Sequence, residues 1–237
     1  MLKVSFHRAS FLVLKMNVKG ILKLERQIYP YQFNDIKVHI AHLFSAYKSV
    51  NDLNTIASIK QMTKEQIYNT FYETDETIIY TVEKLMYMQI SKEQVEKVLE
   101  TLQTYVIPFE QPSNKQIEKV FRKIKKLKAP FISNEVLLES TYIGWNDLAS
   151  NRKFIIYYDA QGRFNGFYGD ISHQTVKGFC AICNKESNVA LFMRKTRTSS
   201  DGQYTKKGDY ICYDSTKCNQ QLSDITQFYR FINKIHA

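Results

Sequence analysis

The chain has 237 residues and a formal net charge of +10, from 33 basic and 23 acidic side chains. Its hydrophobic content of 44%, with only 12 glycines and prolines together, excludes a disordered or fibrous protein and allows one large domain or two small ones. No apolar run approaches the roughly 20 residues that a membrane-spanning helix needs. The apolar run at residues 11–14 is also too short for a secretory signal. We therefore expect a cytoplasmic protein.

The charge divides the chain into three segments. Residues 1–27 carry six basic and one acidic side chain, residues 28–111 seven and eleven, and residues 112–237 twenty and eleven, so their net charges are +5, −4 and +9. The first segment lacks a hydrophobic pattern, and we expect a basic N-terminal extension that is poorly ordered. We predict a helical bundle domain over residues 28–110 and an α/β domain over residues 111–237.

The helical domain is predicted from periodicity. From residue 28 to about residue 105 most apolar residues recur every three or four positions, as they do on one face of a helix. A first helix is expected to open at residues 29–31, Tyr-Pro-Tyr. The pairs Thr63 with Gln66 and Ser91 with Gln94 have the spacing of capping boxes, which predicts that further helices begin there.

Two prolines, Pro108 and Pro112, break this pattern and mark a domain boundary, because proline cannot continue a helix interior. A basic helix is then expected from Ser113, capped through Gln116, with an apolar stripe that reaches Leu127. Seven cations surround the stripe: Lys115, Lys119, Arg122, Lys123, Lys125, Lys126 and Lys128. This pattern is typical of an amphipathic helix whose charged face lies in solvent, but the cations could also neutralise phosphates.

After Trp145 the hydrophobic period shortens towards two, which predicts strands. The expected elements are strands over residues 154–158, 164–168, 189–193 and 210–212, a turn at 159–162, a polar loop over 196–208 and a last helix capped by Ser223. The predicted fold class is therefore α+β, an N-terminal helical bundle followed by a mixed α/β domain.

All four cysteines lie in the last quarter of the chain: Cys180, Cys183, Cys212 and Cys218. Two disulfides would conflict with a cytoplasmic location, and a redox Cys-x-x-Cys would leave the second pair unexplained. An iron–sulfur cluster is a further alternative. Four thiolates suit one structural Zn²⁺, and they leave no open position for catalysis. We predict a treble-clef-like zinc site, although the five residues inside the second pair exceed the usual two.

No arrangement of residues points to an enzyme. The histidines are scattered, and the sequence contains neither a glycine-rich phosphate loop nor a G-x-S-x-G motif. The segment from Tyr204 to Tyr210 instead combines aromatic and basic residues beside the predicted zinc site, which is typical of protein-interface hot spots. Phe231 lies on the flank of the last helix's apolar stripe, where the sequence allows either partial exposure or burial.

Six strings, in chain order, resemble the FusB/FusC family of fusidic acid resistance proteins over residues 28–235. They are IYPYQ at 28–32, GWND at 144–147, SNRK at 150–153, VKGFC at 176–180, CNKES at 183–187 and KKGDYIC at 206–212. Residues 1–27 have no counterpart in the family pattern.

The resemblance implies antibiotic resistance by a non-enzymatic route. Proteins of this family bind the C-terminal domains of translation elongation factor G and release the factor from ribosomes on which fusidic acid has locked it. No direct drug binding is expected, and we expect a monomer. The resemblance also implies a four-cysteine zinc site and factor contacts at Phe179, Lys207, Tyr210 and Phe231. The residues alone leave a second hypothesis open, an RNA-binding zinc protein associated with the ribosome.

Overall fold

The structure, a computed structural model of the chain, describes residues 26–87, 90–124, 127, 130–198 and 204–236. These residues fall into two compact units, one that ends at Pro108 and one that begins at Phe109. None of their helices is both long enough and apolar enough to span a bilayer. Of the extension expected over residues 1–27, only Arg26 and Gln27 are described. Gln27 is held in the N-terminal unit, where its backbone N–H donates to the Tyr105 carbonyl oxygen at 2.8 Å.

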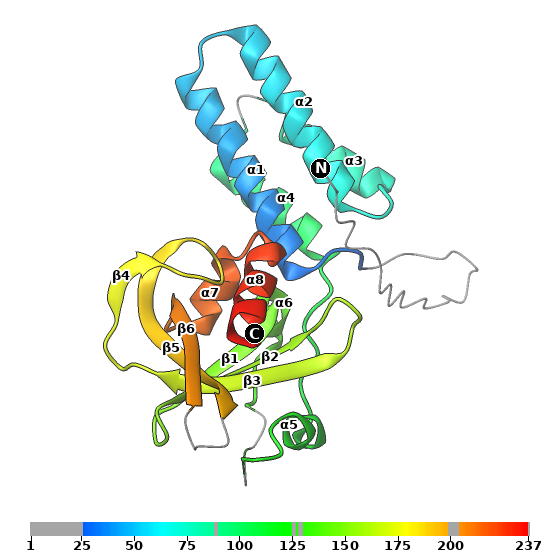
Figure 1. Cartoon of the computed structure of the whole chain (residues 1–237). Coiled ribbons are helices and arrows are strands. Elements are labelled where there is room, and N and C mark those ends of the chain that lie inside the picture. Colours follow the sequence, from blue (N-terminus) through cyan, green and yellow to red (C-terminus); the bar gives the residue numbers. More distant parts are fainter. Residues whose placement is uncertain (1–25, 88–89, 125–126, 128–129, 199–203, 237) are drawn as a thin grey trace, which may run out of the picture. The chain divides into compact units, whose positions relative to one another are not determined.

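The described part of the N-terminal unit consists of α1 (Pro30–Ser49), α2 (Leu53–Thr70), α3 (Glu76–Lys84) and α4 (Lys92–Gln103) (Figure 1). The predicted start of α1 beside Pro30 is confirmed. The capping box before α4 is confirmed as well, because the Ser91 N–H donates to Gln94 Oε1 at 2.8 Å. The apolar stripes of the four helices form the core of this unit, whose buried residues include Ile36, Ile40, Leu43, Ile56, Ile67, Ile78, Val82, Val98 and Leu102.

The helix start predicted at Thr63 is wrong. Thr63 lies inside α2 and is 2% exposed, where backbone N–H groups are already bonded within the helix and no cap is needed. The helix begins instead after Asp52, whose carboxylate accepts from the Thr55 N–H at 2.7 Å. Asp75 caps α3 in the same way. Neither aspartate was predicted as a cap, because the predicted helix starts rested on the Ser/Thr-x-x-Gln spacing alone.

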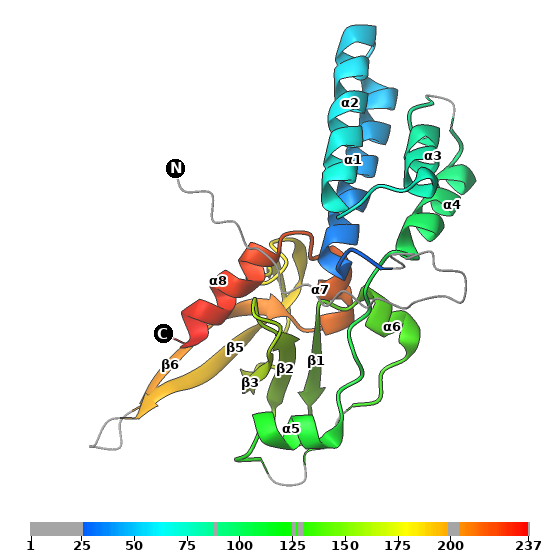
Figure 2. The same ribbon diagram turned by 90° about the vertical axis from the view of Figure 1, so that its right-hand side faces the viewer.

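The C-terminal unit contains a curled antiparallel sheet in the order β1-β2-β3-β5-β4, and β6 pairs with β5 from Val189 to Thr198 (Figures 1 and 2). The strands are β1 (Tyr142–Asp147), β2 (Arg152–Tyr158), β3 (Phe164–Ile171), β4 (Val176–Phe179), β5 (Glu186–Thr198) and β6 (Tyr204–Cys212). The helices are α5 (Asn114–Val120), α6 (Asn134–Glu139), α7 (Ser215–Gln221) and α8 (Ile225–His236). The chain therefore has helices followed by a mixed α/β unit, as predicted.

Both faces of β2 are buried, because α5 and α8 lie on opposite sides of the sheet (Figure 1). On one face Phe154 stacks on Trp145 and meets the edge of Phe121, each at 5.3 Å between ring centroids. On the other face Tyr157 meets the edge of Phe228 in α8 at 5.5 Å. The side chains of residues 153–157 are consequently no more than 7% exposed.

Two predicted helix limits in this unit need correction. The capping box at Ser113 is confirmed, but α5 ends at Val120 because Phe121 leaves helical geometry and turns its ring into the core. The last helix is capped by Asp224, whose carboxylate accepts from the Thr226 N–H at 2.8 Å, and not by Ser223. Three of the seven cations predicted on the basic helix lie outside the described residues: Lys125, Lys126 and Lys128.

The polar loop predicted over residues 196–208 is largely strand. β5 continues to Thr198 and β6 begins at Tyr204, while residues 199–203 lie outside the described part. Lys195 pairs with Lys206 in the ladder, although neither side chain is apolar. Pairing within the hairpin satisfies the backbone groups, so these strands extend without the alternating apolar residues that the prediction required.

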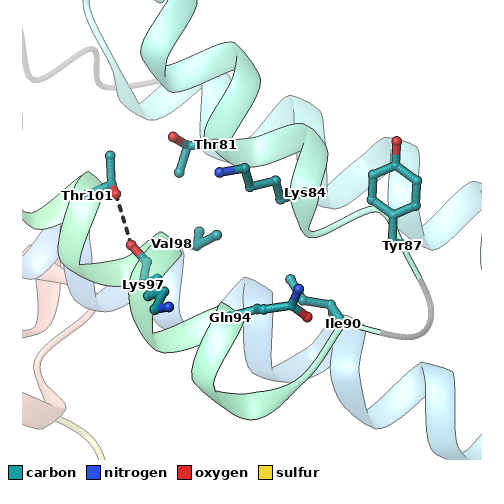
Figure 3. Close-up of a pocket in the computed structure, with 8 residues that line it drawn as sticks. All are labelled: Thr81, Lys84, Tyr87, Ile90, Gln94, Lys97, Val98 and Thr101. Atoms are coloured by element: carbon teal, nitrogen blue, oxygen red, sulfur yellow. Dashed lines mark hydrogen bonds between the residues drawn. The ribbon is translucent and has the colours of Figure 1, made fainter.

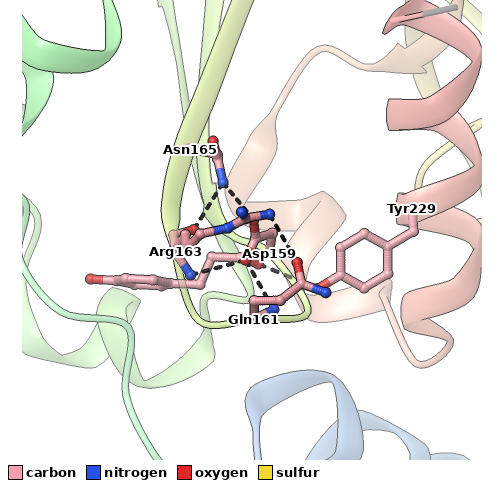
Figure 4. A network of polar contacts seen from close by, with 6 residues as sticks. Asp159, Gln161, Arg163, Asn165 and Tyr229 are labelled. Atoms are coloured by element: carbon pink, nitrogen blue, oxygen red, sulfur yellow. Dashed lines mark hydrogen bonds and ion pairs between the residues drawn. The ribbon is translucent and has the colours of Figure 1, made fainter. Parts of the chain in front are cut away.

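The turn predicted at residues 159–162 is confirmed, and a carboxylate organises it (Figure 4). Asp159 accepts hydrogen bonds from the Gln161 N–H at 2.9 Å, from Arg163 Nε at 2.8 Å and from Asn165 Nδ2 at 2.9 Å. Burial alone would raise the pKa of Asp159, but hydrogen bonds from the Arg163 backbone N–H, the Arg163 side chain and the Gln161 N–H outweigh it and hold the pKa below its usual value. Gly162 supplies the positive φ of 72° that the turn needs.

Gly208→Ala is predicted to destabilise the C-terminal unit by about 1–3 kcal/mol, because the new Cβ would lie 1.8 Å from the Phe192 carbonyl oxygen. Gly178→Ala is the matched control, since its Cβ would meet only Val189 Cγ2 at 3.3 Å. Chemical denaturation followed by fluorescence of Trp145, the single tryptophan, measures both. Equal stability of the two variants would contradict the close approach of β5 and β6.

Candidate metal centre and binding surface

The four cysteines come together at one end of the sheet, as predicted. Their sulfur atoms all lie within 4.8 Å of one another, and no side chain of the four is more than 4% exposed. Cys180 Sγ lies 3.7 Å from Cys218 Sγ, and Cys183 Sγ lies 3.8 Å from Cys212 Sγ. These separations are far longer than the ~2.05 Å of a disulfide bond, so all four thiols are free.

Three separate segments place these sulfurs. Cys180 and Cys183 lie in the tight turn after β4, which is closed by the Asn184 N–H on the Cys180 carbonyl oxygen at 2.9 Å. Asn184 has a φ of 53°, a left-handed conformation that asparagine tolerates better than most residues. Cys212 ends β6, and Cys218 lies in α7. The five residues between them let the strand end and the helix begin, which accounts for the unusually wide spacing.

Backbone donors surround the sulfur of Cys180. The Cys212 N–H donates to Cys180 Sγ at 3.2 Å, and the Ile182 N–H donates at 3.3 Å. Hydrogen bonds from the neighbouring thiols lower the pKa of Cys180, because they stabilise its thiolate. Hydrogen bonds with the neighbouring sulfurs, and then burial, raise the pKa of Cys183 and Cys218, because both favour the protonated thiol. The four thiols therefore act on one another's pKa in opposite directions.

The sulfur geometry fits a tetrahedral metal ion. Zinc–sulfur bonds of about 2.3 Å in a tetrahedron place the sulfurs about 3.8 Å apart. The Cys180–Cys218 and Cys183–Cys212 sulfur separations, 3.7 and 3.8 Å, agree with that distance. Four buried thiolates are also the ligand set that zinc prefers in structural sites. These cysteines could hold one divalent ion, and a closed set of four ligands would give it a structural role.

Exposed apolar side chains lie beside the cluster. Phe179 is 71% exposed next to Cys180, and Tyr210 is 45% exposed on β6. The Ala181 N–H donates to the Tyr210 carbonyl oxygen at 2.9 Å, which fixes the cysteine turn against β6 at this point. Leu191 pairs directly with Tyr210 in the ladder and is 38% exposed. We use the name aromatic surface, after its two rings, for the exposed apolar residues near the cysteine turn: Phe179, Leu191 and Tyr210.

Leu191 was not among the predicted contact residues. Residues 189–193 were predicted as a strand, but their sequence does not show which of them faces solvent. The ladder supplies the missing information, because paired residues on adjacent strands share a face. An exposed leucine opposite an exposed tyrosine then becomes part of the same surface.

The other two predicted contact residues have different environments. Lys207 is half-buried and pairs with Arg194, three residues from Tyr210 and on the other face of β6. Phe231 in α8 is only 2% exposed, and its ring lies 5.9 Å from that of Phe192 beneath the sheet. The structure therefore resolves the two options for Phe231 in favour of burial, and direct contact through its side chain is not available in this conformation.

A hollow of about 750 Å³ lies in the N-terminal unit between α3 and α4 (Figure 3). Lys84 and Lys97 line it from the two helices, and Val98 lies between them. The Lys84 ammonium also stands over the ring of Tyr80 at 4.1 Å. The hollow shares no residue with the cysteine cluster or the aromatic surface.

Comparison with known proteins identifies the family. Residues 27–110 match the family model described as elongation factor G-binding protein, N-terminal. A solved structure of the fusidic acid resistance protein FusC is 45% identical to the chain, with a TM-score of 0.83. The match covers 89% of this chain and 98% of that one. The chain belongs to the FusB/FusC family of fusidic acid resistance proteins. The resemblance inferred from the six sequence strings is thereby confirmed. The sequence matches none of the curated proteins with which it was compared.

Phe231→Ala in this FusB/FusC protein is predicted to lower the free energy of unfolding by about 3–5 kcal/mol, because it leaves a cavity in the core. Tyr210→Ala is predicted to change that free energy by no more than about 0.5 kcal/mol, because its side chain is on the surface. Denaturant titration followed by Trp145 fluorescence measures both values. A Phe231→Ala variant as stable as the wild type would contradict the burial of this ring.

Proposed function

We propose that this protein binds elongation factor G and promotes its release from ribosomes stalled by fusidic acid, which protects the drug's target. The observation that carries the proposal is the FusC match over nearly the whole chain. The match of residues 27–110 to an elongation factor G-binding family model supports it independently. In this proposal the drug is neither modified nor bound, and the protein acts in the cytoplasm as a monomer.

Release by a binding protein requires different affinities for two states of the factor. A protein that bound the ribosome-locked and the free conformation equally well would shift nothing, however tightly it bound. We propose that this protein favours the conformation that the factor adopts off the ribosome. Such a mechanism needs no bond to be made or broken, so it requires no catalytic residues.

The proposed contact surface is the aromatic surface beside the cysteine cluster. Phe179 and Tyr210 offer exposed rings on a backbone fixed by the Ala181–Tyr210 hydrogen bond, and rigid aromatic anchors of this kind dominate protein interfaces. Lys207 would contribute from the opposite face of β6. Phe231, being buried, would act by supporting Phe192 and the strands above it.

The charges suit an acidic partner surface. Residues 112–237 carry a net charge of +9, which speeds encounter with an acidic protein, an effect that falls as salt rises. We propose that this protein contacts the C-terminal domains of elongation factor G through its residues 111–237, and that its residues 28–110 form a separate helical domain. One structural Zn²⁺ held by the four cysteines would keep the contact surface in place.

An RNA-binding role has less support. The basic helix on which the RNA-binding hypothesis rests ends at Val120, and the side chain of the next residue, Phe121, is buried in the core. The described cations after that point, Arg122 and Lys123, therefore lie in a turn and not on a continuous helical face. We favour the protein partner for this reason.

Phe179→Ala and Tyr210→Ala are each predicted to weaken binding to purified elongation factor G by about 10- to 100-fold, because each removes an exposed anchor. Phe131→Ala is the matched control, since Phe131 is 91% exposed in the same unit but outside the aromatic surface. Isothermal titration calorimetry measures the affinities, and translation in vitro with fusidic acid should lose protection in parallel.

Two results would contradict the proposal. One is the absence of any complex between the folded wild-type protein and the factor. The other is tight, strongly salt-dependent binding to free ribosomal RNA that Phe179→Ala and Tyr210→Ala leave unchanged, which would favour the RNA-binding alternative.

A further inference from the structure

Lys153 is a buried lysine in the middle of β2. Its side chain is 1% exposed, although lysine is almost never fully buried unless its charge is compensated. The ammonium donates to Asn146 Oδ1 at 3.1 Å and to the Tyr213 carbonyl oxygen at 2.8 Å. Both acceptors are neutral, so the hydrogen bonds alone do not balance the buried charge.

The negative groups that act on this ammonium lie in and beside the cysteine cluster. In order of effect they are Cys218 as a thiolate, the carboxylate of Asp214, and Cys212 and Cys180 as thiolates. Burial lowers the pKa of Lys153, and these groups oppose that shift because their negative charge stabilises the ammonium; the resulting pKa is about 8. Tyr213, which accepts the shorter hydrogen bond, directly follows Cys212.

The same lysine also fixes the segment between two of the cysteines. The Tyr213 carbonyl oxygen accepts from Lys153 Nζ and from Asn146 Nδ2 at 3.1 Å, so β1 and β2 both hold the residue after Cys212. Asp214 then caps α7, which carries Cys218. Lys153 therefore connects the buried centre of the sheet to the segment that positions two of the four sulfurs.

We propose that Lys153 is the counter-cation and positioning residue of a four-thiolate metal centre. A divalent ion with four thiolates carries a net charge of −2, and its burial is unfavourable without compensation. An ammonium held nearby, in a region of low dielectric, offsets part of that charge. The proposal depends on the metal proposed above, and it assigns to Lys153 a share of the metal affinity.

The test compares zinc affinity among variants of the full chain, by competition of the zinc-loaded protein with a chromophoric chelator. Lys153→Met keeps the length of the side chain and removes its charge, and it is expected to lower zinc affinity by about 10- to 100-fold. Lys153→Arg should retain part of that affinity. Lys185→Met is the control, because Lys185 is exposed although it lies only two residues from Cys183.

A second variant covers the case in which Lys153→Met does not fold. Asn146→Asp places a carboxylate on the ammonium and neutralises it while Lys153 stays in place. It should also lower zinc affinity, with folding checked by Trp145 fluorescence at saturating zinc. Wild-type zinc affinity in either folded variant would overturn the role of Lys153. A wild-type protein that binds no zinc would instead overturn the metal centre itself.

Discussion

The meeting of four buried sulfurs is the constraint on which the rest of the C-terminal unit depends. It joins the turn after β4, the end of β6 and the helix α7, which are separated along the chain. Without a metal ion, four thiols this close together contribute little to stability. Their mutual hydrogen bonds and their burial raise the pKa of Cys183 and Cys218. A metal ion would be coordinated by all four thiolates and so stabilise their close approach. Folding of this unit and metal binding would then be one equilibrium.

The aromatic surface lies at the edge of this cluster. Phe179 precedes a cysteine, and Tyr210 is tied through its carbonyl oxygen to the cysteine turn. Beneath the sheet, Phe231 and Phe192 fill the space between the strands and α8. Exposed rings on a backbone held from both sides lose little conformational freedom on binding, which favours a tight complex. In our proposal the metal ion and the buried core therefore both hold the contact surface in place.

The sequence predicted features set by local chemistry better than features set by tertiary pairing. The capping boxes at Ser91 and Ser113 and the cysteine cluster were found, because each has a fixed spacing with a direct physical cause. Exposure depends on what packs against a residue from elsewhere in the chain. Periodicity could not decide that Phe231 is buried, that Leu191 faces solvent, or that polar residues continue β5 and β6. The burial of Lys153 was likewise not predictable, since it depends on packing among β1, β2 and the segment that follows β6.

The measurement that tests the central claim most directly is the affinity of the protein for elongation factor G before and after metal removal. Calorimetry would compare the zinc-loaded protein, the protein stripped by a chelator, and the stripped protein after zinc is restored, with circular dichroism reporting helix content in each. The account predicts that binding is lost on stripping and recovered with one equivalent of zinc, while the helices of residues 28–110 persist. Equal affinity with and without the metal would contradict it.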